Sequence, residues 1–238
     1  MAQAPALKLL AFDAYGTLFD VMSVSTRLEH HFPGQGQSLA RLLRDKQVEY
    51  SRLRALAGPS RYKPFWDLTR DALVYTLSAF GQPQNQAVIE DILAAYREMK
   101  AFPEVQAVLA NLQATGQPLV VLSNGNPDML EDALRSAGLG PLFQAVLSAE
   151  SVKRFKVSPE VYGLATQFGS CTPEEVLLVS SNAWDVAGAQ WSGLRGFWVN
   201  RSALPFEQLD LLPTGQGSDL RDLIPFLLSA TPGSGPSC

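Results

Sequence analysis

Short apolar runs alternate with segments of helical periodicity over much of the chain. The runs cover residues 9–12, 119–122, 145–147, 176–179 and 197–199, and the helical patterns cover residues 104–114, 128–137, 159–168 and 183–191. Short apolar runs bounded by turn residues are typical of buried strands, and their alternation with helices is typical of parallel βαβ units. The pattern therefore predicts an α/β fold with a doubly wound, Rossmann-like parallel sheet.

One long segment interrupts this alternation. About a hundred residues of mainly helical pattern separate the first two predicted strands, which is far longer than a normal crossover. Helices are expected there at residues 39–56, 64–80 and 85–99. We therefore predict an inserted helical cap at residues 19–99, a catalytic core at residues 1–18 and 100–228, and a flexible tail rich in Pro, Gly and Ser at residues 229–238.

Composition narrows the class of protein. A hydrophobic content of 46% over 238 residues is enough for a sizeable core, and a net charge of −4 argues against a nucleic-acid partner. Cys171 and Cys238 are the only cysteines in the sequence, so it has no disulfide framework and no cysteine metal site. With no apolar stretch of transmembrane length and no signal-peptide pattern, we expect no membrane association and a cytoplasmic location.

An acidic residue, Asp13, ends the first apolar run, and a small-residue turn with Thr17 follows it. Open α/β sheets bind their ligands beyond the carboxyl ends of the strands, so Asp13 is expected to face a cleft. A buried acid without a partner is costly, and carboxylates can form covalent ester intermediates. Asp13 is therefore the candidate nucleophile.

Polar residues also follow two later predicted strands. The loop after residue 122 could bind an anion at a helix N-terminus, or it could be an ordinary capping loop. In the loop after residue 179, Asp185 could complement a helix dipole and Trp184 could belong to the core. The candidates at these two strand ends are Ser123, Asn124, Ser180, Asn182, Trp184 and Asp185.

Three more candidates lie elsewhere. Lys156 directly precedes a predicted helix and could point into the cleft, although a solvated position is the usual fate of a lysine. Tyr162 falls one turn into that helix and could be core packing. Arg44 lies in a cap helix and by itself is typical of a surface cation. No histidine occurs in the predicted core, which excludes a histidine triad or zinc site there.

Taken together, these blocks resemble the L-2-haloacid dehalogenase family over residues 7–228. Ser180-Ser181-Asn182-Ala183-Trp184-Asp185 is the most discriminating block. Phosphatases of the same superfamily carry a second Asp two residues after the nucleophile and an acidic Gly-Asp region in the later block, whereas this chain has Tyr15 and Ser180-Ser181. A halide leaves as a stable anion and needs no proton, so these replacements fit carbon–halogen cleavage without a metal or other cofactor. The chain departs from the family at Val157, where Pro usually follows the lysine.

The resemblance also implies a mechanism. Asp13 would displace the halogen of a short (S)-2-haloacid to give an ester, and water would hydrolyse the ester to an (R)-2-hydroxy acid. For the first step, the resemblance implies that Arg44, Asn124 and Trp184 bind the halide, and that Ser123 and Lys156 bind the substrate carboxylate or position Asp13, to which Thr17 donates a hydrogen bond. For the second step, it implies that Asp185 is the general base and that Ser180 and Asn182 orient Asp185 or the water. Tyr15 and Trp184 would form an apolar wall, and Tyr162 would lie beside the substrate.

Two other functions remain as alternatives. One is a magnesium-dependent phosphatase of the same superfamily, which the missing second acid disfavours. The other is a non-catalytic anion-binding protein on this fold, which the set of Asp13, Lys156 and Asp185 disfavours. The expected partner is a small 2-haloacid, and the oligomeric state is left open, with a homodimer as one alternative.

Overall fold

A six-stranded parallel sheet forms the centre of the computed structural model, which describes residues 5–230. The strand order is β3-β2-β1-β4-β5-β6. Phe12 at the end of β1 pairs with Val121 on β2 and Val179 on β4, so the carboxyl ends of these three strands lie side by side. The strands are β1 (Leu9–Phe12), β2 (Leu119–Ser123), β3 (Ala145–Ser148), β4 (Val176–Ser180), β5 (Arg195–Val199) and β6 (Gly215–Gly217).

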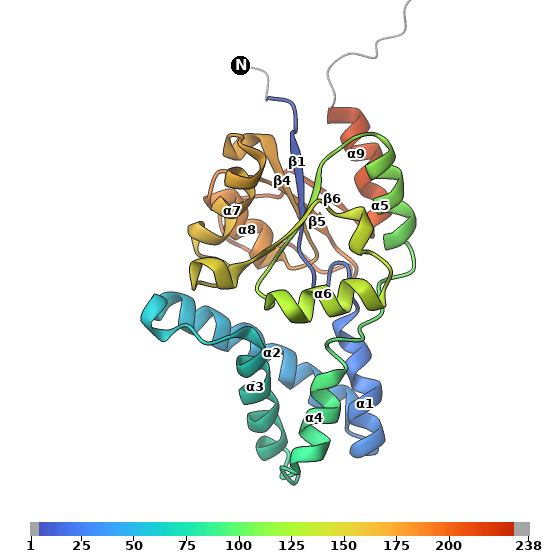
Figure 1. Ribbon diagram of the computed structural model, residues 1–238, viewed down its shortest axis with the longest axis vertical. Coiled ribbons are helices and arrows are strands. Elements are labelled where there is room, and N and C mark those ends of the chain that lie inside the picture. Colours follow the sequence, from blue (N-terminus) through green and yellow to red (C-terminus); the bar gives the residue numbers. More distant parts are fainter. Residues whose placement is uncertain (1–4, 231–238) are drawn as a thin grey trace, which may run out of the picture.

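Helices cover both faces of the sheet. Helices α7 and α8 lie on one side of the strands in Figure 1, and α5 and α9 lie on the other. The alternation of side chains along β1 explains this arrangement, since Leu10 and Phe12 belong to one buried cluster while Leu9 and Ala11 belong to a second. The core helices are α5 (Val105–Ala114), α6 (Pro127–Ser136), α7 (Pro159–Gly169), α8 (Ala183–Trp191) and α9 (Leu223–Ala230).

The helical cap lies beyond the carboxyl ends of the strands (Figure 1). It contains α1 (Val24–His31), α2 (Gly36–Ala57), α3 (Phe65–Ala79) and α4 (Gln86–Ala94). Phe19 on the outgoing connection pairs with Ala101 on the returning one. From the core, Arg201 donates to the Thr17 carbonyl and forms an ion pair with Glu104, so it links both connections. One hydrophobic cluster runs from the sheet into all four cap helices and couples the two parts.

Four elements differ from the predicted pattern. The predicted pattern lacked β6, which is short and contains two glycines and no apolar residue. It also lacked α1 and α9, whose apolar positions are few or interrupted by Pro225. The helix predicted at 85–99 ends at Ala94. Helix α9 continues to Ala230, two residues into the range predicted as a tail, and residues 231–238 lie outside the described part of the chain. No helix within residues 5–230 combines the length and apolar character needed to span a membrane.

Candidate active site

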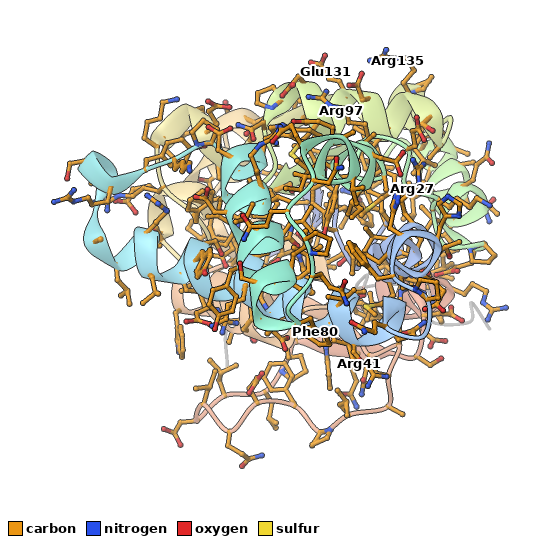
Figure 2. The ribbon with its side chains drawn as sticks, turned by 90° about the horizontal axis from the view of Figure 1, so that it is seen from below. Arg27, Arg41, Phe80, Arg97, Glu131 and Arg135 are labelled. Atoms are coloured by element: carbon orange, nitrogen blue, oxygen red, sulfur yellow. The ribbon has the colours of Figure 1, made fainter. Side chains whose placement is uncertain are left out.

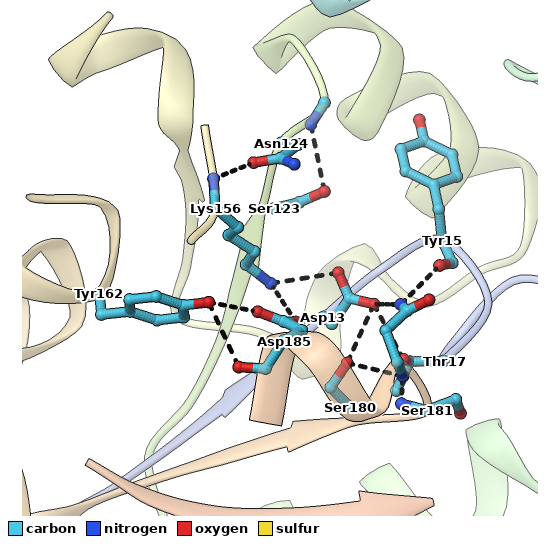
Figure 3. Close-up of polar contacts among 12 residues, drawn as sticks. Asp13, Tyr15, Thr17, Ser123, Asn124, Lys156, Tyr162, Ser180, Ser181 and Asp185 are labelled. Atoms are coloured by element: carbon cyan, nitrogen blue, oxygen red, sulfur yellow. Dashed lines mark hydrogen bonds and ion pairs between the residues drawn. The ribbon is translucent and has the colours of Figure 1, made fainter. Parts of the chain in front are cut away.

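The carboxylate of Asp13 is the centre of a polar network at the carboxyl end of β1 (Figure 3). Its Oδ2 atom accepts hydrogen bonds from Asn182 Nδ2 at 2.8 Å, Thr17 Oγ1 at 3.0 Å and Ser180 Oγ at 3.4 Å. Its Oδ1 atom has one polar partner within residues 5–230, the Lys156 ammonium at 3.2 Å. With 6% of its surface exposed, Asp13 is almost fully removed from solvent. The two carboxylate oxygens therefore differ: one is held by three donors, and the other by one.

Lys156 joins two buried carboxylates. Its Nζ atom lies 2.7 Å from Asp185 Oδ2 as well as 3.2 Å from Asp13 Oδ1. Burial alone would lower the pKa of the Lys156 ammonium, but the two carboxylates outweigh burial and hold that pKa above its ordinary value. The backbone N–H of Lys156 donates to Asn124 Oδ1 at 2.8 Å, so both ends of the residue are fixed.

Asp185 has no solvent-exposed surface and lies behind Lys156. Tyr162 donates a hydrogen bond to Asp185 Oδ1 at 2.9 Å. Burial raises the pKa of the Asp185 carboxyl group, and the neighbouring Lys156 counteracts this in part. Asp185 is therefore a stronger base than an ordinary aspartate.

Loop geometry after β4 brings these groups to Asp13. Ser180 is the last residue of β4, and its hydroxyl accepts the backbone N–H of Asn182 at 3.1 Å. Asn182 precedes α8, and Asp185 lies in the first turn of that helix. The backbone N–H of Ser181 donates to Thr17 Oγ1 at 2.8 Å, which ties this loop to the one after β1.

The cap contributes Arg44 from α2. Its guanidinium donates to the Tyr15 carbonyl at 3.2 Å and to Asn182 Oδ1 at 3.3 Å. Asn182 thus accepts from the cap with one end of its amide and donates to Asp13 with the other. The cap and the Asp13 carboxylate are therefore linked through this one side chain.

A small cavity lies between Asp13 and the cap. The space open to the centres of water molecules is about 20 Å³, which suits a ligand of a few heavy atoms. The predicted residues that line it are Asp13, Tyr15, Arg44, Ser123, Asn124, Asn182 and Trp184. Asn124 uses its Oδ1 atom on Lys156, which leaves Nδ2 as the end that can donate to a ligand.

Four lining residues were absent from the predicted site. They are Gln47, Val48, Ser51 and Phe65. The first three lie three, four and seven residues after Arg44, which places them on the same face of α2. That spacing, together with two polar residues on an otherwise apolar face, is the signal that could have identified them. Phe65 begins α3 and carries no such signal.

Five predicted residues do not line the cavity. Thr17, Lys156 and Ser180 contact Asp13 from behind instead. Tyr162 was expected beside the substrate, but it is fully buried and contacts Asp185, because α7 directs it into the core. Ser180 and Asn182 were expected to orient Asp185 or a water molecule, and in the structure both side chains donate to Asp13. Asp185, the fifth, is shielded by Lys156.

The residues around Asp13 do not suit a magnesium ion. Mg²⁺ prefers carboxylate and carbonyl oxygens in octahedral geometry. Burial raises the pKa of the Tyr15 phenol, so that side chain stays neutral. Within residues 5–230, no group of three or more His, Cys, Asp or Glu side chains is arranged to hold a metal ion. The Lys156 ammonium supplies the positive charge between Asp13 and Asp185.

Comparison with known proteins identifies relatives of this arrangement. The haloacid dehalogenase-like hydrolase family matches residues 7–193. An (S)-2-haloacid dehalogenase from Xanthobacter autotrophicus is 44% identical over 184 residues, which are 77% of this chain and 71% of that protein. The crystal structure of an L-2-haloacid dehalogenase superposes with a TM-score of 0.92 at 46% identity, covering 94% of this chain and all of the other. The L-2-haloacid dehalogenase of Xanthobacter autotrophicus with chloropropionic acid covalently bound superposes with a TM-score of 0.86 at 36% identity, covering 94% and 98% of the two chains.

Replacing the bridging ammonium tests the electrostatics of the site. Lys156→Met leaves two buried carboxylates without their shared cation, so we expect a loss of about 3–5 kcal/mol in the free energy of unfolding at pH 7. The pKa of Asp185 is already raised in the folded protein and rises further without Lys156. The folded state then binds more protons than the unfolded state above the ordinary Asp pKa of 3.8, and its stability falls as the pH rises through that interval.

Urea unfolding between pH 5 and pH 8 measures this effect. The Lys156→Met protein should lose more stability over this range than the wild type. Lys153→Met is the matched control, because Lys153 is exposed and bridges no pair of buried carboxylates among residues 5–230; its ion pair is with Glu150. Equal stability losses in the two variants would contradict the bridging role.

Proposed function

The chain belongs to the haloacid dehalogenase-like hydrolases, and we propose that it hydrolyses short (S)-2-haloalkanoic acids to (R)-2-hydroxy acids and halide through an ester on Asp13. Its similarity to (S)-2-haloacid dehalogenases places it among the hydrolases of carbon–halide bonds. The observation that carries the mechanism is the unequal environment of the two Asp13 oxygens beside a small, cap-covered cavity. The covalently bound chloropropionic acid in the Xanthobacter autotrophicus relative supports a covalent step.

In the first step, Asp13 Oδ1 attacks C2 of the haloacid. Oδ1 is the freer oxygen, since Oδ2 accepts three hydrogen bonds. A C–O bond forms as the carbon–halogen bond breaks, and the bonding pair leaves with the halide. Attack from the side opposite the halogen inverts C2, which converts an (S)-haloacid into an (R)-ester.

The departing halide gains charge only as its bond breaks. Arg44, Asn124 and Trp184 line the cavity and offer a guanidinium, an amide and an aromatic edge to a large anion. Such donors act strongly in a site from which water is excluded, and they stabilise the transition state more than the bound substrate. Ser123 lines the same cavity, where it can bind the substrate carboxylate.

In the second step, water adds to the carbonyl carbon of the Asp13 ester. Oδ2 becomes the carbonyl oxygen and takes up negative charge in the tetrahedral intermediate. Thr17, Ser180 and Asn182 already donate to it and so form an oxyanion hole. Asp185, whose pKa is raised by burial, is the proposed acceptor of the water proton. Collapse of the intermediate expels the 2-hydroxy acid, whose oxygen takes up a proton, and restores the carboxylate.

Halide release from separate enantiomers tests the reaction. We expect the purified protein to release chloride from (S)-2-chloropropionate and not from the (R) enantiomer, with the same rate in EDTA, because Lys156 supplies the charge that a metal would otherwise provide. Loss of activity in EDTA with recovery on added magnesium would contradict the proposal. Magnesium-dependent release of phosphate from p-nitrophenyl phosphate would favour the phosphatase alternative instead.

Arg44→Ala tests the role of the cap in the chemistry. Removing a charged donor from a water-poor site should cost ~3 kcal/mol of transition-state stabilisation, or about a hundredfold in the rate of halide release. Arg44→Lys should recover only part of this, since an ammonium lacks the planar guanidinium whose Nη2 atom donates to both Tyr15 and Asn182. The measurement is single-turnover halide release at saturating substrate, with exposed Arg41→Ala on the same helix as control. Equal rates for wild type and Arg44→Ala would remove Arg44 from the catalytic residues.

A further inference from the structure

A wide groove adjoins the small cavity around Asp13. It lies between α2 and the loop that follows β5, and the space open to water centres is about 600 Å³. Arg44, Val48, Asn182 and Trp184 line both the groove and the cavity. These shared residues separate the nucleophile from the groove, so a ligand in the groove is one layer of side chains away from Asp13.

Arg52 is a cation without an anionic partner in this groove. Its side chain is half-buried, and within residues 5–230 it has neither an ion pair nor a side-chain hydrogen bond. Its guanidinium lies over the Trp184 ring, 4.6 Å from the ring centre. Burial lowers the pKa of the Arg52 guanidinium, and the negative charge of Glu207 counteracts this in part.

Acidic side chains line the same groove as the two arginines. Asp45, Glu49 and Glu207 line it, but Glu49 is paired with Lys46 at 2.7 Å. Glu207 lies on the opposite loop and supports the charged form of Arg52 without forming an ion pair with it. Arg44 and Arg52 both lie on α2, where Arg52 is about two helical turns beyond Arg44, or about 12 Å along the helix axis. The two guanidiniums thus mark a path from the groove toward the cavity.

We propose that this groove is the access route of the haloacid and that Arg52 binds its carboxylate before the molecule passes Trp184 into the cavity. The proposal rests on the haloacid hydrolysis proposed above. An incoming carboxylate forms the ion pair that Arg52 lacks. This pairing weakens the contact between the Arg52 guanidinium and the Trp184 ring. A cation at the mouth of a low-dielectric passage raises the local concentration of anionic substrate and selects acids over their neutral amides.

The association rate of (S)-2-chloropropionate tests this role apart from turnover. Asp13→Asn serves as the reference protein because its amide cannot displace the halide. Tryptophan fluorescence in a stopped-flow instrument reports binding near Trp184. Adding Arg52→Gln should lower the association rate constant on the order of tenfold, the lower end of electrostatic steering. Arg52→Lys should restore most of the rate, because steering needs the charge and not the planar shape.

Two charge controls sharpen the test. Arg41→Gln removes an equal charge from the exposed surface of the same helix and should leave the rate unchanged; Arg41 is labelled in Figure 2. Glu207→Gln removes a negative charge from the groove and should raise the rate. Equal association rates with and without Arg52→Gln, or no recovery with Arg52→Lys, would overturn the access role while the wild type still releases halide. Absence of halide release by the wild type would instead overturn the proposed function.

Discussion

The contact of one buried ammonium with two buried carboxylates is the constraint on which this site depends. Asp13 follows β1 and Asp185 lies in the first turn of α8, and the two carboxylates would repel one another in a low-dielectric interior, where an unpaired charge is costly. Lys156 satisfies both at 3.2 and 2.7 Å. Because Oδ1 of Asp13 is held by this single contact, it remains the freer oxygen, and the hydrogen-bond donors of the β1 and β4 loops are directed to Oδ2.

The parallel sheet explains why these groups can meet at all. The ends of β1, β2 and β4 are adjacent, so the loops that carry Asp13, Asn124 and Asn182 emerge at one edge. The cap then closes over that edge, and Arg44 reaches the core through Tyr15 and Asn182. Excluding water from the enclosed space strengthens the charge–dipole interactions that a departing halide needs. The sheet therefore positions Asp13, and the cap encloses it.

Much of this arrangement could be predicted from the sequence. Apolar runs predicted five of the core strands, and the polar residues at their ends pointed to Asp13, Asn124 and Asn182, since parallel strands share one ligand-binding edge. The position of Arg44 followed only from the resemblance to a family, because an arginine on a helix carries no signal of its own. The strand β6 had no apolar pattern to reveal it.

The partners of each side chain could not be predicted. The sequence predicted Tyr162 and Ser180 as site residues but not their contacts, which are with Asp185 and Asp13. The direction of the Tyr162 side chain depends on how α7 packs. The bridging position of Lys156 depends on its approach to Asp13, which is 143 residues away in the sequence. Gln47 and Ser51 could be recognised only after Arg44 was known to point at the site, because they lie on the same face of the helix as Arg44.

The central claim is that an oxygen of Asp13 forms the bond that replaces the halogen, and a single turnover in oxygen-18 water tests it most directly. Enzyme in excess over (S)-2-chloropropionate is allowed to react once, and the peptide that contains Asp13 is then examined by mass spectrometry together with the product. The account predicts one oxygen-18 atom in Asp13 and none in the new hydroxyl group, because water attacks the ester carbonyl. Label in the product hydroxyl with an unlabelled Asp13 would mean that water attacks the substrate directly, and would contradict the account.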